Sequence, residues 1–248
     1  MCTVVFIPTK NGIFFGSLRD ESPKRPTAVA PKEYTHKKTL FVSPKDPLAG
    51  GTWIGLNNEE NIIILLNGGF KNHEKRNNYF KSRGIIVTEL LVEENPVVAW
   101  ELMDLQDVEP FTLVMWCNKN LFQLVWDGEL RHKILLNETC SYIWSSSTLY
   151  DEDAKIKREN MFHQWLSTKP VITTQSLLKF FGSYVDTDNG FLINRNEITK
   201  TLSYTSVEIS KHANGIMSYI DFLNNTNQVC KVPLLDGIQK IIGQNNKV

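Results

Sequence analysis

The sequence lacks the features that mark membrane and secreted proteins. No apolar run approaches the roughly 18–20 residues that a transmembrane helix needs, because the most apolar stretches, residues 62–66 and 84–92, are short or interrupted. The first eight residues (MCTVVFIP) have neither the basic segment nor the small-residue cleavage site of a signal peptide. These absences predict a cytoplasmic protein without an integral membrane segment.

Net charge is also missing, since 27 Lys and Arg residues balance 27 Asp and Glu residues. Without a basic excess or a basic stripe, nucleic acid is not an expected partner. The four cysteines are scattered without a C-x-x-C pair, which predicts free thiols. The five histidines show no metal-ligand spacing. A calcium loop beginning at Asp186 is disfavoured because Phe191 occupies the place where such a loop needs glycine. We therefore expect no metal site.

The 248 residues, 42% hydrophobic and 22% charged, are typical of a globular chain that buries roughly 70–75% of its unfolded surface. Apolar runs at 4–7 and 13–15 flank Asn11-Gly12, which favours a β-hairpin with these two residues at the turn. Residues 22–50 hold five prolines and predict an irregular excursion.

Further along, the apolar spacing predicts alternating helices and strands. Helices are expected at 82–94, 96–105, 151–166 and 174–181, and strands at 62–66, 111–117, 121–126, 201–209 and 215–222. Residues 50–56 are expected to form a turn that leads into a strand. Hairpins separated by helices favour an α+β fold of antiparallel sheets. No interdomain linker is evident, so we expect a single domain over residues 1–248.

Cys2 is the most informative residue. Removal of Met1 would make Cys2 the first residue, with a thiol and an α-amine whose reference pKa values lie near 8.5 and about 7.7–8.0. Because these values are close, the amine can take the thiol proton, and the thiolate is the nucleophile. This combination of base and nucleophile in one residue is the N-terminal-nucleophile arrangement.

The expected hairpin brings charged residues to Cys2. With Asn11-Gly12 at the turn, paired positions sum to 23, so Cys2 faces Glu21 and Thr3 faces Asp20; a turn one residue different places Asp20 opposite Cys2. A carboxylate there could hold the α-amine, and Arg19 could bind an anionic or carbonyl group. The alternative is that these charges form the solvated end of a hairpin.

Three other features are candidates for ligand binding. Trp53 either stacks on a ligand or belongs to the core. Arg83 in the first turn of a helix opposes the helix dipole, so it needs a partner, which is either a carboxylate such as Glu21 or an anionic ligand. The basic loop at 71–81 either closes over an anionic ligand beside Asn67 or is a solvated loop.

Several motifs occur in order along the first 95 residues: Met1-Cys2 before a strand, LRDE (18–21), RP (25–26), GGTWIGL (50–56), LLN (65–67) and SRG (82–84). In these motifs the chain resembles the NRDE family, also called the transport and Golgi organisation protein 2 family. The resemblance implies an αββα sandwich of the N-terminal-nucleophile hydrolase type, with helices flanking two antiparallel sheets. It further implies that Cys2 is the nucleophile, that Asp20 orients the amine and that Asn67 donates to the oxyanion.

Two functions follow as hypotheses. The first is hydrolysis of a linear amide (C–N) bond in a small amphipathic or anionic substrate, without a required cofactor, with Arg19, Glu21, Trp53 and Arg83 binding the ligand. The second, which the family also implies, is a non-catalytic carrier of haem or of acyl-CoA and lipid. Leu18 and Ser147 stand where the family pattern has asparagine, and no arginine lies near 203–205; these departures favour the carrier. A protein-interaction scaffold is a third option.

Overall fold

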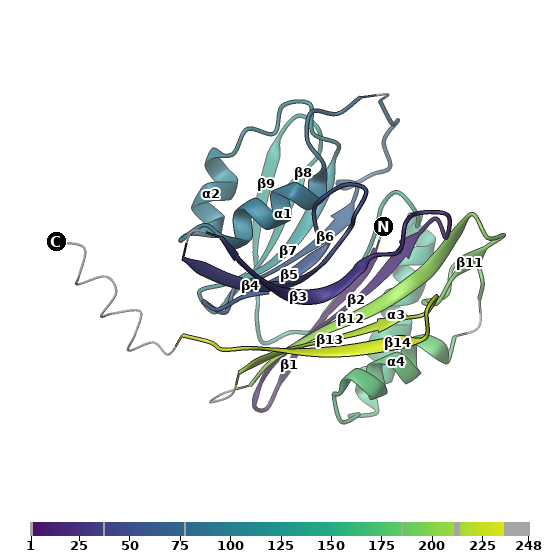
Figure 1. Ribbon diagram of the computed structural model, residues 1–248. Helices are drawn as coiled ribbons and strands as arrows, with labels where there is room; N and C mark the ends of the chain where they lie inside the picture. Colours follow the sequence, from purple (N-terminus) through teal and green to yellow (C-terminus); the bar gives the residue numbers. More distant parts are fainter. Residues whose placement is uncertain (1, 37, 77, 185, 211–213, 236–248) are drawn as a thin grey trace.

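The chain folds into two antiparallel sheets that face each other (Figure 1). The computed structural model describes residues 2–36, 38–76, 78–184, 186–210 and 214–235, and of Cys2 only the backbone. The first sheet has the order β10-β1-β2-β12-β13-β14, with β11 paired to β12. Its strands are β1 (Cys2–Thr9), β2 (Gly12–Glu21), β10 (Tyr142–Ser145), β11 (Asn194–Arg195), β12 (Thr199–Ser210), β13 (Gly215–Asp221) and β14 (Thr226–Val232).

The second sheet is a meander in which each strand pairs with the next one along the chain. Its strands are β3 (Val29–His36), β4 (Thr39–Lys45), β5 (Ile54–Asn57), β6 (Ile62–Asn67), β7 (Phe111–Cys117), β8 (Asn120–Trp126) and β9 (Arg131–Leu136). Asn118 and Lys119 form the turn between β7 and β8 with φ angles of 51° and 61°, as a type I′ turn requires. The strands expected at 62–66, 111–117 and 121–126 are confirmed.

Helices cover the outer face of each sheet. The second sheet carries α1 (Arg83–Leu91) and α2 (Pro96–Leu102), and the first carries α3 (Glu152–Ser167) and α4 (Thr174–Gly182). Local sequence explains where these helices begin: Pro96 occupies the first turn of α2, and the Asp151 side chain accepts from the backbone N–H of Ala154 at the start of α3. The four layers confirm the predicted αββα sandwich.

Strand β1 is apolar on both faces because it lies inside the sandwich. Val4 and Phe6 belong to the core between the sheets, whereas Val5 and Ile7 pack toward α3 and α4. All four are at most 3% exposed. The alternation fixes which face each position of β1 and of its partner β2 occupies.

The predicted register of the first hairpin is wrong by two residues. Thr9 pairs with Gly12, so Lys10 and Asn11 form the turn, paired positions sum to 21, and Cys2 faces Arg19. Gly12 serves another purpose, since a Cβ there would lie 1.9 Å from the carbonyl oxygen of Ile209 in β12. The glycine is needed for the close approach of β12 rather than for the turn.

The predicted irregular excursion at 22–50 is also wrong. Strands β3 and β4 occupy most of it and pair with each other, with an irregularity between Val29 and Lys32. Strands β9, β10 and β14 were not predicted either. Their residues are largely exposed or half-buried, so their sequences lack the strong apolar signal of a central strand.

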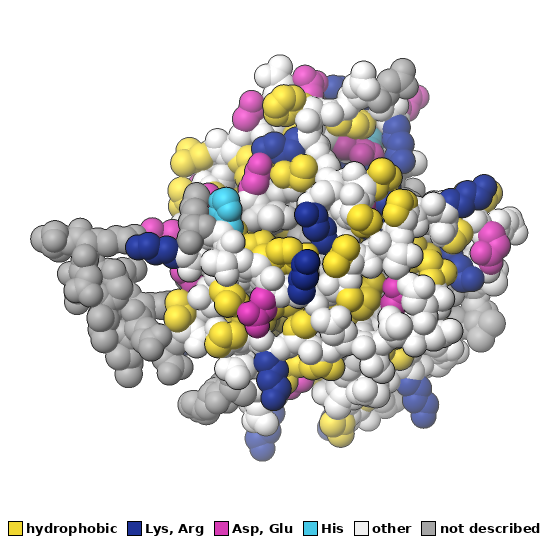
Figure 2. All heavy atoms as spheres, in the orientation of Figure 1, with side chains coloured by type: hydrophobic (Ala, Val, Ile, Leu, Met, Phe, Trp, Pro, Cys, Tyr) yellow, Lys and Arg dark blue, Asp and Glu magenta, His cyan; other side chains and the backbone are white. Residues whose placement is uncertain are grey.

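The face of the molecule in Figure 2 carries charges of both signs. Basic and acidic side chains are interspersed with hydrophobic and neutral ones across it. Among the described residues on this face, no extended region of one sign is visible. The even balance of the composition is therefore also present locally on this surface.

Candidate active site

The first residues of β1 lie beside Arg19 at one end of the first sheet. Cys2 pairs with Arg19, and cross-strand partners share a face. Val4, two positions along, belongs to the core between the sheets. Position 2 therefore lies on the face turned toward the second sheet, and the Cys2 side chain itself is outside the described residues.

Asp20 lies on the opposite face and is fully buried. Its carboxylate accepts hydrogen bonds from the Thr201 Oγ1 at 2.7 Å and the Tyr150 hydroxyl at 3.4 Å. Burial raises the pKa of Asp20 to about 6, against the lowering effect of the Thr201 bond and of the Arg158 charge. Strand β2 continues from Arg19 to Asp20 at the end of the pairing where β1 begins, so the backbone nitrogen of Cys2 lies on the Asp20 side of the Cys2–Arg19 pair.

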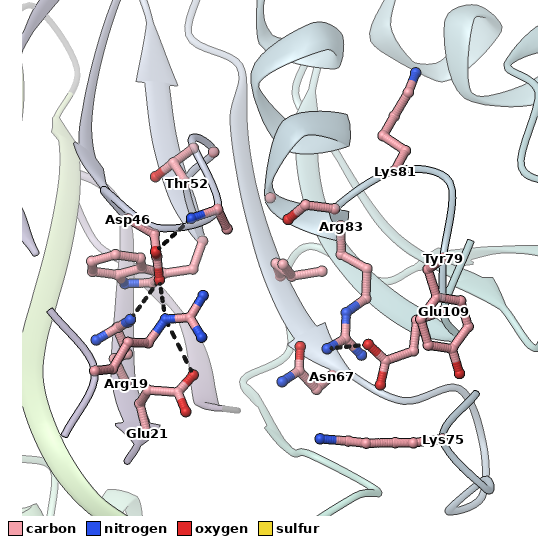
Figure 3. Close-up of a pocket in the computed structure, with 17 residues that line it drawn as sticks. Arg19, Glu21, Asp46, Thr52, Asn67, Lys75, Tyr79, Lys81, Arg83 and Glu109 are labelled. Atoms are coloured by element: carbon pink, nitrogen blue, oxygen red, sulfur yellow. Dashed lines mark hydrogen bonds and ion pairs between the residues drawn. The ribbon is translucent and has the colours of Figure 1, made fainter. Parts of the chain in front are cut away.

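Arg19 is held against Trp53 by a shared carboxylate (Figure 3). Its guanidinium carbon lies 4.6 Å from the Trp53 ring centroid, and its Nη2 contacts Asp46 Oδ2 at 2.8 Å. Arg25 Nε contacts the same oxygen at 2.7 Å and lies 4.0 Å from Glu21. Trp53 is 5% exposed, so it is a core residue that also supports Arg19.

Asp46 is a site residue that the sequence analysis missed. Burial acts to raise its pKa, but the hydrogen bonds from Arg25 and the backbone of Ala49, with the Arg19 charge, outweigh that effect and hold the pKa below its usual value. Its other oxygen accepts from the backbone N–H groups of Leu48 and Ala49, both at 3.0 Å. An Asp at the start of a proline- and glycine-rich turn is the signal that could have identified it.

Asn67, Arg83 and Glu109 form the opposite wall (Figure 3). Arg83, the first residue of α1, contacts Glu109 at 2.8 Å. The expected partner of Arg83 was a carboxylate such as Glu21 or an anionic ligand; the carboxylate that pairs with it is that of Glu109, and Glu21 lies on the Arg25 side. Glu109 lies in a loop between α2 and β7 with no motif to mark it, so sequence reasoning did not find it. Asn67 ends β6 and lines the same space as Arg19.

Two of the family-like motifs pack directly on each other. The backbone N–H of Thr52 donates to the carbonyl of Gly84 at 3.0 Å. A Cβ on Gly51 would lie 2.1 Å from the carbonyl carbon of Gly84. This contact, which only glycine allows, places the first turn of α1 beside Trp53, so Arg83 faces the same space.

The space between these walls is a cleft of about 440 Å³. It is lined by five basic and three acidic side chains: Arg19, Arg25, Lys75, Lys81, Arg83, Glu21, Asp46 and Glu109. Lys81 points away and pairs with Glu89 at 2.9 Å, whereas Lys75 lies below Asn67 in the view of Figure 3, with its amine directed toward the side of Arg19 and Glu21. Among the described residues lining the cleft, Lys75 is the cation without an ion pair. The cleft can therefore accept an anionic group.

A second groove of about 300 Å³ lies beyond Asn67. The two are separated where the Ser146 hydroxyl donates to the Asn67 carbonyl at 2.7 Å. Ser147 lines this second groove rather than the cleft. Leu18 is buried in the core toward α3 and α4. Neither departure from the family pattern thus faces the cleft.

The segment at Asp186 and two of the five histidines have ordinary local contacts in the structure. Asp186 accepts from the backbone N–H groups of Asp188 and Asn189 at 3.0 and 2.8 Å, which makes a turn at this point. His73 lies 3.2 Å from Glu109, and His36 is exposed at the end of β3. Within the described ranges, no group of three His, Cys, Asp or Glu side chains is placed to hold a metal ion. In the same part of the chain no helix has the length and apolar character to cross a membrane.

Comparison with solved structures supports the fold. An N-acylethanolamine-hydrolysing acid amidase orthologue from Caenorhabditis elegans is 14% identical, with 83% of this chain and 92% of that chain covered and a TM-score of 0.57. Two variants of the conjugated bile acid hydrolase from Clostridium perfringens are each 10% identical over 93% of this chain and 92% of theirs, with TM-scores of 0.59 and 0.63. At these identities the likeness shows the N-terminal-nucleophile hydrolase fold alone.

Comparison with curated proteins gives no match. A family model does match: that of transport and Golgi organisation 2, over residues 1–226. This range contains the cleft, both of its walls and the first hairpin. The chain therefore belongs to the transport and Golgi organisation 2 family.

Proposed function

We propose that the protein is an N-terminal-cysteine hydrolase that cleaves a linear amide bond in a small amphipathic substrate with an anionic group. The observation that carries the proposal is the placement of position 2 next to Arg19, on the face turned toward the cleft that Arg19 and Asn67 line. The structural neighbours are named as an amidase and a hydrolase, which supports the proposal by analogy of fold only.

The proposed reaction needs a free α-amine on Cys2. The amine takes the thiol proton, and the thiolate attacks the amide carbon to give a tetrahedral oxyanion. Collapse of that intermediate breaks the C–N bond, returns the proton to the leaving amine and leaves a thioester. Water then attacks the thioester, which releases the carboxylic acid and restores the thiol.

Each nearby residue has a role in this scheme. The Asn67 side-chain amide donates to the oxyanion, a contribution that typically exceeds 2 kcal/mol for such donors. Ionised Asp20 balances the α-ammonium that forms when the thiol loses its proton. Arg19 and Lys75 bind the anionic group of the substrate. Trp53 supports the Arg19 guanidinium from behind.

Mass spectrometry of the purified chain tests the proposal. We expect the mass of a chain that starts at Cys2, and fast alkylation of Cys2 by iodoacetamide at neutral pH, located by peptide mapping. Cys140 is exposed and serves as the internal reference for an ordinary thiol. A panel of N-acyl p-nitroanilides, assayed on the wild type and on Cys2→Ala, then tests turnover. Retained Met1 would remove the α-amine that acts as the base, and equal reactivity of Cys2 and Cys140 would show that the Cys2 thiol is not activated; either result would refute the proposal.

A carrier of an amphipathic anion is the second candidate, favoured by the Lys75 amine, which lines the cleft and has no ion pair there among the described residues. Haem or acyl-CoA would be its cargo, held through carboxylate or phosphate groups by Lys75 and Arg19, and it would act in the cytoplasm. Titration with haemin and with palmitoyl-CoA tests it, because a ligand of the folded state raises the melting temperature. Binding that is equal in wild type and Cys2→Ala, without turnover, would favour the carrier.

A further inference from the structure

Arg158 is a buried cation that the proposed reaction does not use. It lies in the second turn of α3 and is 1% exposed. Its Nε donates to the Ser145 hydroxyl at 2.9 Å, its Nη1 to the carbonyls of Asn189 and Gly190, and its Nη2 to the Thr3 hydroxyl. Removing a guanidinium from water is costly, and these acceptors are all neutral. A nearby anion is needed to balance the charge.

The contacts of Arg158 converge on the first residues of β1. Thr3 directly follows Cys2 in the chain and pairs across the sheet with Ser145 of β10. Arg158 thus holds both members of this pair at once. The first residues of a chain fray unless something fixes them, so this guanidinium restrains the backbone that carries Cys2.

Asp20 is the anion that Tyr150 connects to Arg158. Its carboxylate accepts hydrogen bonds from the Tyr150 hydroxyl, in the segment before α3, and from the Thr201 hydroxyl of β12. In a chain without Met1, the α-amine of Cys2 would lie on the Asp20 side of the Cys2–Arg19 pair. The Arg158 charge lowers the pKa of Asp20, opposing the effect of burial. Tyr150 lies between the two, with its ring centroid 4.1 Å from the Arg158 guanidinium carbon.

Arg195 provides a natural comparison. It also lies over the Tyr150 ring, at 5.3 Å, and donates to the carbonyl of Leu149 at 3.0 Å. Its other hydrogen bonds go to the carbonyl of Asp188 and to the Asn189 side chain, whereas those of Arg158 reach Ser145 and Thr3. The two arginines thus share one aromatic neighbour but differ in their reach to Ser145 and Thr3.

We propose that Arg158 is a positioning residue of the Cys2 site, which fixes the start of β1 through Thr3 and keeps Asp20 ionised to pair with the α-ammonium of Cys2. This role rests on the proposed N-terminal-cysteine hydrolase. Its two parts are separable: the hydrogen bond to Thr3 acts on position, and the charge acts on Asp20.

The effect of the Arg158 charge is tested by following the ¹³C NMR signal of the Asp20 carboxyl as a function of pH. This signal is assigned by its disappearance in Asp20→Asn. In Arg158→Met the midpoint should rise by about one pH unit or more, the usual effect of losing a nearby opposite charge. In Arg195→Met it should stay at the wild-type value. Should Arg158→Met fail to fold, Arg158→Gln removes the charge and keeps a donor toward Thr3. An equal midpoint in the Arg158 and Arg195 variants would overturn the proposal, whether or not Cys2 proves reactive.

The positioning is tested by Thr3→Val, which keeps the shape and removes the acceptor. The Asp20 midpoint should not move, while the rate of Cys2 alkylation by iodoacetamide should fall several-fold at every pH. A wild-type alkylation rate in Thr3→Val would refute the positioning part. If Cys2 of the wild type reacts no faster than Cys140, the hydrolase proposal fails instead, and the Asp20 titration still decides whether Arg158 controls that carboxyl.

Discussion

Replacing Asp20 with asparagine should change how stability depends on pH. A carboxyl whose pKa is raised by folding holds its proton more tightly in the folded than in the unfolded chain. The stability it contributes is fully present below the unfolded value of 3.8 and is lost as pH rises through the folded value of about 6. Asp20→Asn has no such proton, so the difference between the two proteins isolates the effect.

The magnitude follows from the shift. Going from 3.8 to about 6 corresponds to about 3 kcal/mol at roughly 1.4 kcal/mol for each pH unit. Most of this, about 2 kcal/mol, should appear between pH 4 and pH 7. Because Asp20 is fully buried, solvent screening does not reduce it as it would for a surface group.

Urea unfolding of both proteins at several pH values measures the prediction. Wild type should lose about 2 kcal/mol relative to Asp20→Asn on going from pH 4 to pH 7. All other titrating groups are common to the two proteins and cancel in the difference. A difference that is flat across this range would show that folding does not shift the pKa of Asp20, and one that grows with pH in favour of the wild type would show that folding lowers it. Either result would refute the reasoning.

Three further predictions concern the cleft. Lys75→Gln should lower the ratio of Cys2 alkylation rates by iodoacetate and iodoacetamide roughly threefold at low salt, while Lys81→Gln should not, because Glu89 already balances Lys81. Gly51→Ala should lower the free energy of unfolding in urea by about 1–3 kcal/mol, because the new methyl group clashes with the backbone of α1. Gly50→Ala should lower it less, because position 50 has open space around it and only its positive φ opposes a side chain. Asp46→Asn should lower stability by roughly 1–3 kcal/mol and reduce the same iodoacetate preference, because Arg19 loses its anchor; an unchanged preference would contradict that role.

Helices and central strands of this fold can be predicted from the sequence, but edge strands and the pairing between strands cannot. Helices α3 and α4 begin at capping residues that the sequence displays, and the central strands β6 and β7 are continuous apolar runs. These features depend on neighbours within one turn or one strand. Edge and half-exposed strands such as β3 and β9 are not predicted, because their formation depends on pairing with the rest of the sheet rather than on their own residues.

Residues of the candidate site are missed by sequence analysis for a related reason: the residues that contact one another are far apart along the chain. Arg19 and Asp46 are 27 positions apart, and Thr3 and Arg158 are 155 apart. Nothing in the local sequence of α3 distinguishes Arg158 from the other charged residues of that helix, most of which are exposed. Only the packing of α3 against β1 and β10 selects it. The motifs near Cys2 therefore drew attention to Arg19 and Asp20 but gave no signal for Asp46, which binds Arg19, or for Arg158, which binds Thr3.

The difference between the expected and the observed register of the first hairpin leaves each side chain on the expected face of the sheet. Moving the pairing sum from 23 to 21 shifts β2 by two residues, roughly 7 Å along the strand, and a shift of two leaves every side chain on its original face. Arg19 and Glu21 therefore remain on the face of position 2, as the first register implied, while the alternative of a single-residue change would have placed Asp20 there. Because side chains alternate between the two faces of a strand, adjacent residues of β2 still lie on opposite faces. Arg19 faces the cleft, and Asp20 faces Thr201, Tyr150 and the helices behind the sheet. The proposed chemistry uses a ligand-binding cation and a buried carboxylate beside one nucleophile, and two consecutive residues of a strand can present such groups on its opposite faces.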